Sequence, residues 1–552
     1  MSLPTQPMTP VPAETAQVAR AAFPKGNRYL TWRDELGPVY TDEAFRDLFA
    51  RRGQPAQSPA SLALVTIMQF MENLSDREAA EAVRSRIDWK YLLGLELSDP
   101  GFDFSVLNEF RQRLLGGSAE TLLLDRLLAL ARARGLLKAR GQQRTDSTHV
   151  LAAIRHLNRL ELVGEALRQA LNRLAEVAPD WLRGWVPAEW YRRYGQRIEQ
   201  FRLPKSAAAQ QAWGLQVGAD GLQLLAACWA AAAPAEVRSL PAVECLRQIW
   251  IQQYGWIAGE MYWRPNDERP AAALLIKSPY DCEARFAIKR ETEWVGYKAQ
   301  VTETCDPQRP ALITQVTTTA ATTTDSQALP SIQAALAAKD LLPAEHLVDA
   351  GYASAQHRVT SQQQYQLDLI GPALRATTWQ AQAQQGFELR EFHIDWEHQH
   401  VTCPQGQTSC GWSPRRTAAG RDWIQVRFAT SDCQACPVRP ACTHAKRGRT
   451  LQLMVQPEYE ALLAARQRQT TPEYQALYAH RAGIEATLSH AVRRCDLRHS
   501  RYIGLAKTRL QHVLTAVALN MARLIDWLSQ AHPTPRRSPP FAALAPAAQF
   551  AN

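Results

Sequence analysis

The sequence has no apolar run long enough to span a bilayer. Its most apolar stretch, residues 222–234, is shorter than the roughly 20 residues that a membrane-spanning helix needs. The first 25 residues contain five prolines and lack the apolar segment of a signal peptide. We therefore expect a cytoplasmic protein with no membrane partner.

Cysteine is too scarce for a fold that depends on disulfides, with 10 cysteines among 552 residues. Without an export signal, the expected compartment is reducing. Five cysteines show no metal-ligand spacing and are predicted to be small buried apolar residues: Cys228, Cys245, Cys282, Cys305 and Cys495.

Acidic residues are outnumbered by basic ones. The chain has 63 Lys and Arg against 53 Asp and Glu, which gives a formal net charge of +10. This excess favours a polyanionic partner. A hydrophobic content of 46% and a charged content of 21% are ordinary for a globular protein. A chain of this length is expected to form about two to four domains.

The N-terminal part of the sequence is predicted to be helical. Residues 1–28 and 529–552 are rich in Pro and Ala, so both ends are expected to be flexible. Residues 29–140 show helical periodicity and are predicted to form a compact helical domain. Within it, Ser75 and Glu78 have the spacing of a capping box. Helices are expected at about 79–93 and from Ser105 onward.

Residues 141–528 carry the pattern of an α/β domain. A first strand is expected around Asp146. Further elements follow in the order strand, strand, helix, strand, strand: 294–302, 311–319, 326–342, 345–350 and 366–370. Two insertions interrupt this order. The first insertion spans about residues 150–290, and its helical pattern extends to about residue 270. The second insertion is Cys-rich and spans about residues 380–455. Residues 456–528 are again helical.

Three acidic residues are the strongest candidates for chemistry: Asp146, Asp349 and Glu485. The first two lie in or at the end of apolar strands, and the third lies in a long helical segment. Taken singly, Asp146 and Asp349 are typical of turn or cap residues. If a fold gathers the three carboxylates, they form a hard-cation site suited to phosphodiester cleavage.

Two neighbours strengthen the interpretation of Glu485. In a continuous helix, Arg481 and Tyr478 lie at about 40° and 20° from Glu485, so all three share one face. The Arg can bind a phosphate oxygen with its planar fork, and the Tyr can position the DNA backbone or stack on a base. The alternative is a surface Arg–Glu pair beside a packed tyrosine.

A basic run follows this segment and is opposed only by Asp496. Its members are Arg493, Arg494, Arg498, Arg501, Lys507 and Arg509. Such a run suits a phosphate backbone, and each phosphate contact makes binding more salt-dependent. A solvated charged face is the alternative.

Four cysteines have the spacing of a structural zinc site: Cys403, Cys433, Cys436 and Cys442. Cys410 and His444 are further candidate ligands. A free, reduced cluster remains the alternative. Elsewhere, Lys298 could face the acidic site, although a lysine on a strand usually faces solvent, and His149 could line the same cleft.

Together these residues resemble the DDE-type transposases of bacterial insertion sequences, relatives of retroviral integrases. The resemblance rests on Asp146, on Asp349 with Gly351-Tyr352, and on the pattern Tyr478-x2-Arg481-x3-Glu485. It extends to N-terminal segments that look like the helical domain of one branch of these enzymes: 68–70, 74–79, 88–91 and 100–105. One position departs from the pattern, because Val492 stands where relatives often carry Lys or Arg.

The resemblance implies a ribonuclease H-like mixed-sheet core in which Asp146, Asp349 and Glu485 hold two Mg²⁺ or Mn²⁺ ions. One ion would activate water and later a DNA 3′-hydroxyl, and the other would stabilise the leaving oxygen. Tyr478 and Arg481 would position the DNA. The helical domain would read terminal inverted repeats, and a homodimer would act on paired ends and target DNA. The compartment would be the bacterial cytoplasm, at the nucleoid when DNA is bound.

Two other functions fit the same residues. A metal-dependent nuclease of this fold would cut DNA without joining it, and detection of strand-transfer products would exclude it. A non-catalytic DNA-binding derivative is the second alternative. Retention of all three acids argues against it, because clustered negative charge opposes binding to phosphates.

Overall fold

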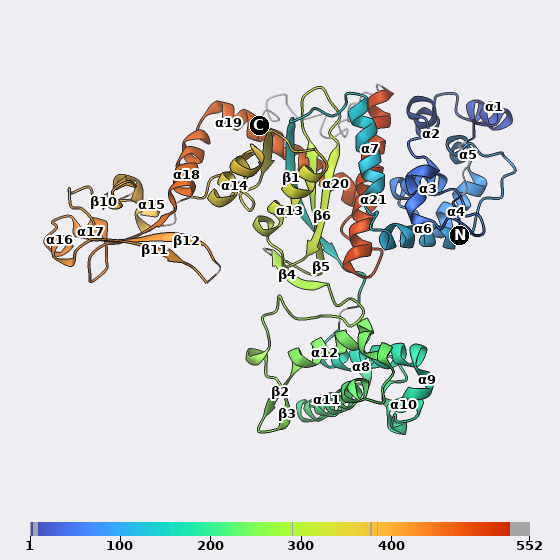
Figure 1. Cartoon of the computed structure of the whole chain (residues 1–552), viewed down its shortest axis with the longest axis horizontal. Helices are drawn as coiled ribbons and strands as arrows, with labels where there is room; N and C mark the ends of the chain where they lie inside the picture. The colour runs from blue at the N-terminus through green and yellow to red at the C-terminus, as the bar shows by residue number, and fades with distance from the viewer. Residues whose placement is uncertain are drawn as a thin grey trace, which may run out of the picture. The chain divides into compact units, whose positions relative to one another are not determined.

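The computed structural model describes residues 2–3, 9–155, 157–289, 291–375, 378–383, 385–418 and 420–529. The chain divides into two compact units (Figure 1). One comprises residues 1–119 and 517–552, and the other residues 120–516. From residue 530 onward, the segment expected to be a flexible tail lies outside the described residues.

The N-terminal part of the first unit is helical, as expected. Its α-helices are α1 (Ala13–Ala22), α2 (Arg28–Thr31), α3 (Pro59–Glu72), α4 (Asp76–Ser85), α5 (Ile87–Leu93) and α6 (Ser105–Gly116). Helix α1 falls within the segment expected to be flexible, and its Ala19 packs in one cluster with Leu30 and Tyr91.

The predicted capping box opens α4, where Ser75 and Glu78 each accept a hydrogen bond from the other's backbone N–H. The single helix expected at 79–93 is in fact two. Arg86 has an extended backbone between α4 and α5, and its guanidinium pairs with Glu72 and Asp88.

A mixed sheet forms the centre of the second unit. Its main strands are β1 (Gln142–Leu151), β5 (Thr292–Thr304), β6 (Ile313–Ala320), β7 (Glu345–Val348) and β8 (Asp368–Ile370). They lie in the order β6–β5–β1–β7–β8, with β4 (Arg285–Lys289) paired to β5. The pairs β6–β5 and β5–β1 are antiparallel, whereas β1–β7 and β7–β8 are parallel. The predicted ribonuclease H-like α/β fold class is therefore confirmed.

Two helices make the crossovers between the parallel strands. Helix α13 (Asp325–Ala338) leads from β6 to β7, and α14 (Ala355–Tyr365) leads from β7 to β8. Ile332 and Leu336 of α13 pack in one cluster with Val348 and Tyr352. This packing covers one face of the sheet, and the start of α13 lies beside the middle of β1 and the turn after β7.

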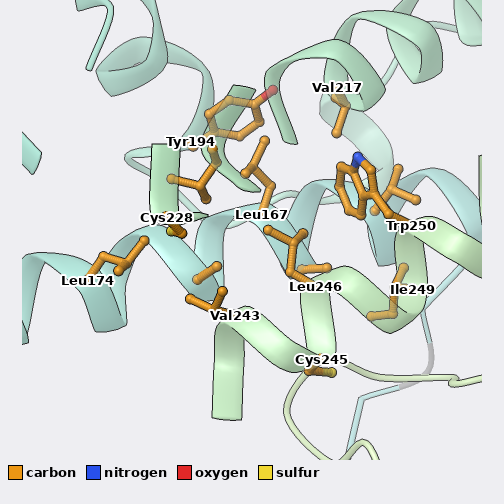
Figure 2. Packing of buried hydrophobic residues seen from close by; sticks show 14 of the residues in the cluster. Leu167, Leu174, Tyr194, Val217, Cys228, Val243, Cys245, Leu246, Ile249 and Trp250 are labelled. Atoms are coloured by element: carbon orange, nitrogen blue, oxygen red, sulfur yellow. The ribbon is translucent and has the colours of Figure 1, made fainter. Parts of the chain in front are cut away.

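The helical insertion lies between β1 and β5. It contains α8 (Arg159–Val177), α9 (Pro179–Arg183), α10 (Ala188–Tyr194), α11 (Ala207–Trp229) and α12 (Pro241–Gln253). These helices enclose a separate core of buried residues that includes Leu167, Tyr194 and Trp250 (Figure 2).

The helices of this insertion end earlier than predicted. After α12 the chain forms a hairpin of β2 (Tyr254–Ile257) and β3 (Glu260–Trp263). Ala258 and Gly259, both at positive φ, make the tight turn. The prediction of helix to about residue 270 was therefore wrong.

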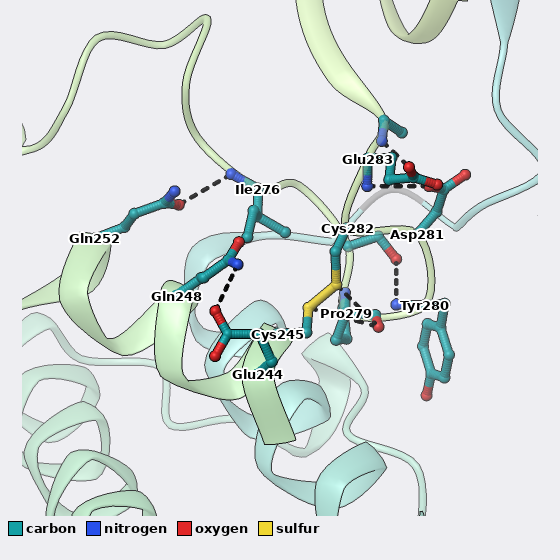
Figure 3. The surroundings of a disulfide bond; sticks show 12 residues. Glu244, Cys245, Gln248, Gln252, Ile276, Pro279, Tyr280, Asp281, Cys282 and Glu283 are labelled. Atoms are coloured by element: carbon teal, nitrogen blue, oxygen red, sulfur yellow. Dashed lines mark hydrogen bonds between the residues drawn. A yellow bond between two sulfur atoms is a disulfide. The ribbon is translucent and has the colours of Figure 1, made fainter. Parts of the chain in front are cut away.

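One disulfide contradicts the prediction for two of the cysteines. Cys245 on α12 is bonded to Cys282, and their Cα atoms lie 6.2 Å apart (Figure 3). The loop before β4 returns to α12 and brings together two residues that are 37 positions apart in sequence. Spacing along the chain could not reveal this pairing.

The Cys-rich insertion is a small β-rich region with short helices. Its elements are α15 (Trp379–Ala383), β9 (His393–Asp395), β10 (His400–Thr402), β11 (Gly411–Arg416), β12 (Asp422–Arg427), α16 (Thr430–Gln434), α17 (Arg439–Cys442) and β13 (Thr450–Met454). Strands β11, β12 and β13 form one antiparallel sheet.

Four further helices belong to the second unit: α7 (Leu122–Ala133), α18 (Gln456–Arg468), α19 (Pro472–Ala479) and α20 (Gly483–Cys495). The last helix, α21 (Leu505–Leu528), begins in the second unit and ends in the first. Over the described ranges, no helix combines the length and apolarity required to cross a bilayer.

Two buried histidines predict acid sensitivity of the second unit. Burial lowers the pKa of His346 to about 4 and that of His512 to about 3. An unfolded histidine titrates near pH 6.5, so the unfolded chain takes up these protons first as the pH falls. The free energy of unfolding should therefore decrease from about pH 6.5 toward pH 4, as measured by urea denaturation. His346→Gln should weaken this dependence, and His398→Gln, at an exposed position, should not.

Candidate active site

Asp146 and Asp349 come from neighbouring strands. Strands β1 and β7 are parallel, with Thr145 opposite Val348. Asp146 follows Thr145 within β1, and Asp349 follows Val348 directly after the end of β7. The Asp146 side chain is only 14% exposed. The parallel register therefore brings together two acids that are distant in sequence, as the interpretation of the sequence required.

Two groups hold the carboxylate of Asp146. The backbone N–H of Ser147 donates to Oδ1 at 2.7 Å, and Nη2 of Arg481 donates to Oδ2 at 2.7 Å. Burial is the main cause that raises the pKa of Asp146, and the nearby Asp349 adds to it. The Ser147 N–H and Arg481 act in the opposite direction.

Asp349 lies in the tight turn that follows β7. Its Oδ1 accepts a hydrogen bond from the backbone N–H of Gly351 at 2.8 Å. A methyl group at Gly351 would lie 3.0 Å from Asp349 Oδ1 and 3.3 Å from Oδ2 of Asp325. Glycine at this position therefore leaves the space between two carboxylates open.

Glu485 lies in the first turn of α20, with its side chain 68% exposed. Its Oε1 accepts from Nη1 of Arg481 at 3.2 Å, so one guanidinium links Glu485 to Asp146. Burial lowers the pKa of Arg481, but Asp146 and its other neighbours outweigh this and raise it.

The prediction of one continuous helix through Tyr478, Arg481 and Glu485 was wrong. Tyr478 belongs to α19, and a short 3₁₀ turn, His480–Ala482, separates it from α20. Tyr478 stacks on Tyr474 with ring centroids 5.6 Å apart, and burial raises its pKa to about 12. Asp146 and Asp349 contribute to that increase, so Tyr478 does lie near the acidic pair.

A buried ion pair attaches the start of α20 to the sheet. Arg144 of β1 lies 2.7 Å from the carboxylate of Glu303 on β5, which is fully buried. The other oxygen of Glu303 accepts from Thr487 of α20 at 2.8 Å, and Arg144 also donates to the carbonyl of His480. A side chain at Gly483 would meet the guanidinium of Arg144, so a larger residue here would have to displace the group that pairs with Glu303.

The sequence interpretation missed Asp325 and gave little weight to Lys298. Asp325 opens α13 after the N-cap Thr324, and its side chain is 12% exposed. Ser147 Oγ donates to Asp325 Oδ1 at 3.0 Å, and Lys298 Nζ lies 3.8 Å from the same oxygen. Lys298 is 13% exposed, so it does not face solvent as a typical strand lysine does. The neighbouring Thr324 made Asp325 resemble an ordinary residue of a helix start.

The acids have the donor chemistry of a divalent-cation site without forming a closed one. In the described part of the chain, no three His, Cys, Asp or Glu side chains are arranged to hold one metal ion. Asp146 and Asp349 nevertheless present adjacent carboxylates, the ligands that Mg²⁺ prefers. Glu485 is joined to them through Arg481.

The basic run is only partly exposed. Arg493, Arg498 and Lys507 are exposed, whereas Arg494 and Arg501 are half-buried. Arg498 Nε donates to Thr148 Oγ1 of β1 at 3.0 Å, and its backbone carbonyl accepts from Leu151 N. Through Arg498, the run therefore contacts the C-terminal half of β1, the strand that carries Asp146.

The four spaced cysteines line one cavity of about 500 Å³ within the Cys-rich insertion: Cys403, Cys433, Cys436 and Cys442. Burial raises the pKa of Cys442, Arg449 lowers it, and the three other thiols raise it further. Cys410 is exposed and bonds to the carbonyl of Arg427 instead. The four cysteines that the spacing singled out thus line one cavity, although within the described residues no three of them are arranged to hold one metal ion.

Two segments of the chain match known protein families. Residues 18–113 match the family described as transposase domain (DUF772), and residues 402–525 match the family described as transposase DDE domain. The second range includes Glu485 and the four clustered cysteines. No curated protein and no solved structure matches the chain. These two matches, one near each end of a ribonuclease H-like chain, support a DDE-type insertion-sequence transposase.

Proposed function

We propose that the protein cleaves DNA and transfers strands at the ends of an insertion sequence, using divalent ions held by Asp146, Asp349 and Glu485. The observation that carries this proposal is the parallel pairing of β1 and β7, which makes Asp146 and Asp349 neighbours. Mg²⁺ or Mn²⁺ bound there would polarise the phosphodiester and activate an attacking hydroxyl.

The side chains around the acids have distinct tasks in this proposal. The N–H groups of Ser147 and Gly351 hold the two aspartates in fixed orientations. Arg481 joins Asp146 to Glu485 and carries a planar fork suited to a phosphate oxygen. Tyr478, stacked on Tyr474, presents a rigid ring beside the site for positioning the DNA.

DNA binding would extend beyond the acidic site. The exposed Arg493, Arg498 and Lys507 suit contacts with the phosphate backbone of DNA. The half-buried Arg494 and Arg501 would add positive charge beside them. The helical segment 29–140 overlaps the matched transposase domain and is the candidate reader of terminal inverted repeats. A homodimer would hold the paired ends, as the family resemblance implies.

A nuclease that cuts without joining would use the same acids. The two matched transposase families favour strand transfer over simple cleavage. Incubating the protein with pre-cleaved element ends and target DNA separates these functions. Joined products would support the transposase function. Cleavage without joined products would instead favour a nuclease that does not transfer strands.

Single substitutions test the three acids. Asp146→Asn, Asp349→Asn and Glu485→Gln should each lower Mg²⁺-dependent cleavage by about 1,000-fold or more, equivalent to about 4 kcal/mol of transition-state stabilisation. DNA binding, measured by fluorescence anisotropy, should be retained. Asp180→Asn is the matched control, because that side chain is 91% exposed on the helical insertion. Near-normal cleavage by one of the three variants would remove that residue from the site.

Gly351→Ala tests the open space between Asp349 and Asp325. The added methyl group would lie 3.0 Å from Asp349 Oδ1, so the carboxylate must shift. A misplacement of this size should lower the cleavage rate by about 10- to 100-fold. Gly184→Ala, whose methyl group would meet no atom closer than 3.5 Å, should cleave normally. Normal kinetics in the Gly351→Ala variant would show that the turn tolerates the displacement.

We also propose that Cys403, Cys433, Cys436 and Cys442 hold a structural Zn²⁺. Four thiolates are a complete ligand set for tetrahedral zinc, and the four thiols line one cavity. The backbone N–H of Arg449 already donates to Cys433 Sγ at 3.4 Å, the type of bond that supports a ligating sulfur. Zinc would stabilise an insertion whose own apolar core is small.

Elemental analysis tests the zinc site. The purified protein should contain one zinc ion per chain, and Cys436→Ser should remove it and lower the melting temperature. Cys410→Ser should keep the metal, because Cys410 does not line the cavity. A parent protein without zinc would refute this proposal and leave the acidic site unaffected.

A further inference from the structure

Asp325 lies behind the two aspartates of the proposed site. Successive residues of a strand point to opposite faces of the sheet, so Ser147 points away from the face of Asp146. Its hydroxyl donates to Asp325 Oδ1 at 3.0 Å. Asp325 therefore contacts β1 one residue after Asp146, from the face that α13 covers.

The same carboxylate also reaches the turn that holds Asp349. A methyl group at Gly351 would lie 3.3 Å from Asp325 Oδ2, and the Gly351 N–H is the donor to Asp349. Oδ1 of Asp325 thus contacts Ser147 of β1, and Oδ2 packs beside the turn that follows β7. These are the two segments that carry the paired aspartates.

Basic and aromatic neighbours surround Asp325 in this position. Lys298 Nζ donates to the carbonyl of Thr323 at 2.9 Å and lies 3.8 Å from Asp325, so it secures the start of α13. Lys289 lies 3.8 Å from the other oxygen. Burial raises the pKa of the Tyr352 hydroxyl, and the nearby charge of Asp325 raises it further. This hydroxyl therefore stays protonated and belongs to the same polar layer.

We infer that Asp325 is a positioning residue: through Ser147 and the Gly351 turn, it fixes the distance between Asp146 and Asp349 that a divalent cation requires. This inference rests on the proposed metal-dependent function. A typical aspartate at the start of a helix faces solvent and interacts mainly with its own helix. Asp325 differs because it is 12% exposed and accepts a hydrogen bond from the residue adjacent to a candidate ligand.

Mn²⁺ binding by the full-length protein, followed by electron paramagnetic resonance, tests the inference without relying on activity. Asp325→Asn keeps the shape but removes the charge, and it should raise the dissociation constant for Mn²⁺ by about 10- to 100-fold. The Mg²⁺ concentration needed for half-maximal cleavage should rise in parallel, and Asp325→Glu should restore part of the affinity. Asp340→Asn, just beyond the other end of α13 and 95% exposed, is the matched control and should bind Mn²⁺ normally.

A second variant covers the case in which Asp325→Asn does not fold. Ser147→Ala removes only the hydroxyl that joins Asp325 to β1, and it should weaken Mn²⁺ binding in the same direction at an unchanged melting temperature. Wild-type affinity in folded Asp325→Asn or Ser147→Ala would overturn the inference. If the wild-type protein itself binds no Mn²⁺, or if Asp146→Asn binds it normally, the proposed metal site fails instead.

Discussion

The buried ion pair between Arg144 and Glu303 is the constraint on which the candidate site depends. It joins β1 to β5 inside the sheet, and through Thr487 and the His480 carbonyl it also fixes the start of α20. Removing one partner of such a pair leaves an uncompensated buried charge, which typically costs about 3–5 kcal/mol. The position of Glu485 relative to the strands therefore depends on residues that are not themselves candidates for chemistry.

The charges at the site are arranged in two layers. On one face of the sheet, Arg481 lies between Asp146 and Glu485, and on the other, Lys298 and Lys289 lie near Asp325. Asp146 and Asp325 are largely buried, and each has a basic partner, as the cost of burying an unpaired charge requires. Glu485 is exposed and pairs with the same Arg481 as Asp146. The arrangement also separates tasks, because the groups that would meet DNA or metal lie on one face and those that hold the backbone lie on the other.

Much of the fold could be predicted from local sequence. The alternating and apolar runs predicted β5, β6, β7 and β8 to within a few residues. Asp146 and Asp349 each resembled a turn or cap residue, and only the combined pattern with Glu485 singled them out. The features that were missed depend on contacts distant along the chain. The 3₁₀ turn at His480–Ala482 breaks a helical pattern that periodicity alone would continue. The role of Asp325 depends on its contact with Ser147, 178 positions away, and the pairing of Cys245 with Cys282 depends on the return of a loop.

The insertion between β1 and β5 has a consequence for how the chain folds. In a simple hairpin these two strands would meet soon after synthesis, whereas here Thr145 and Thr302, which share a hydrogen bond, are 157 positions apart. The helices between them have a core of their own and can collapse without the sheet. On a ribosome, β1 would emerge long before its antiparallel partner, and an exposed strand edge of this kind invites wrong pairing. Early collapse of the inserted helices would shorten the distance that β5 must search and limit the time that β1 remains unpaired.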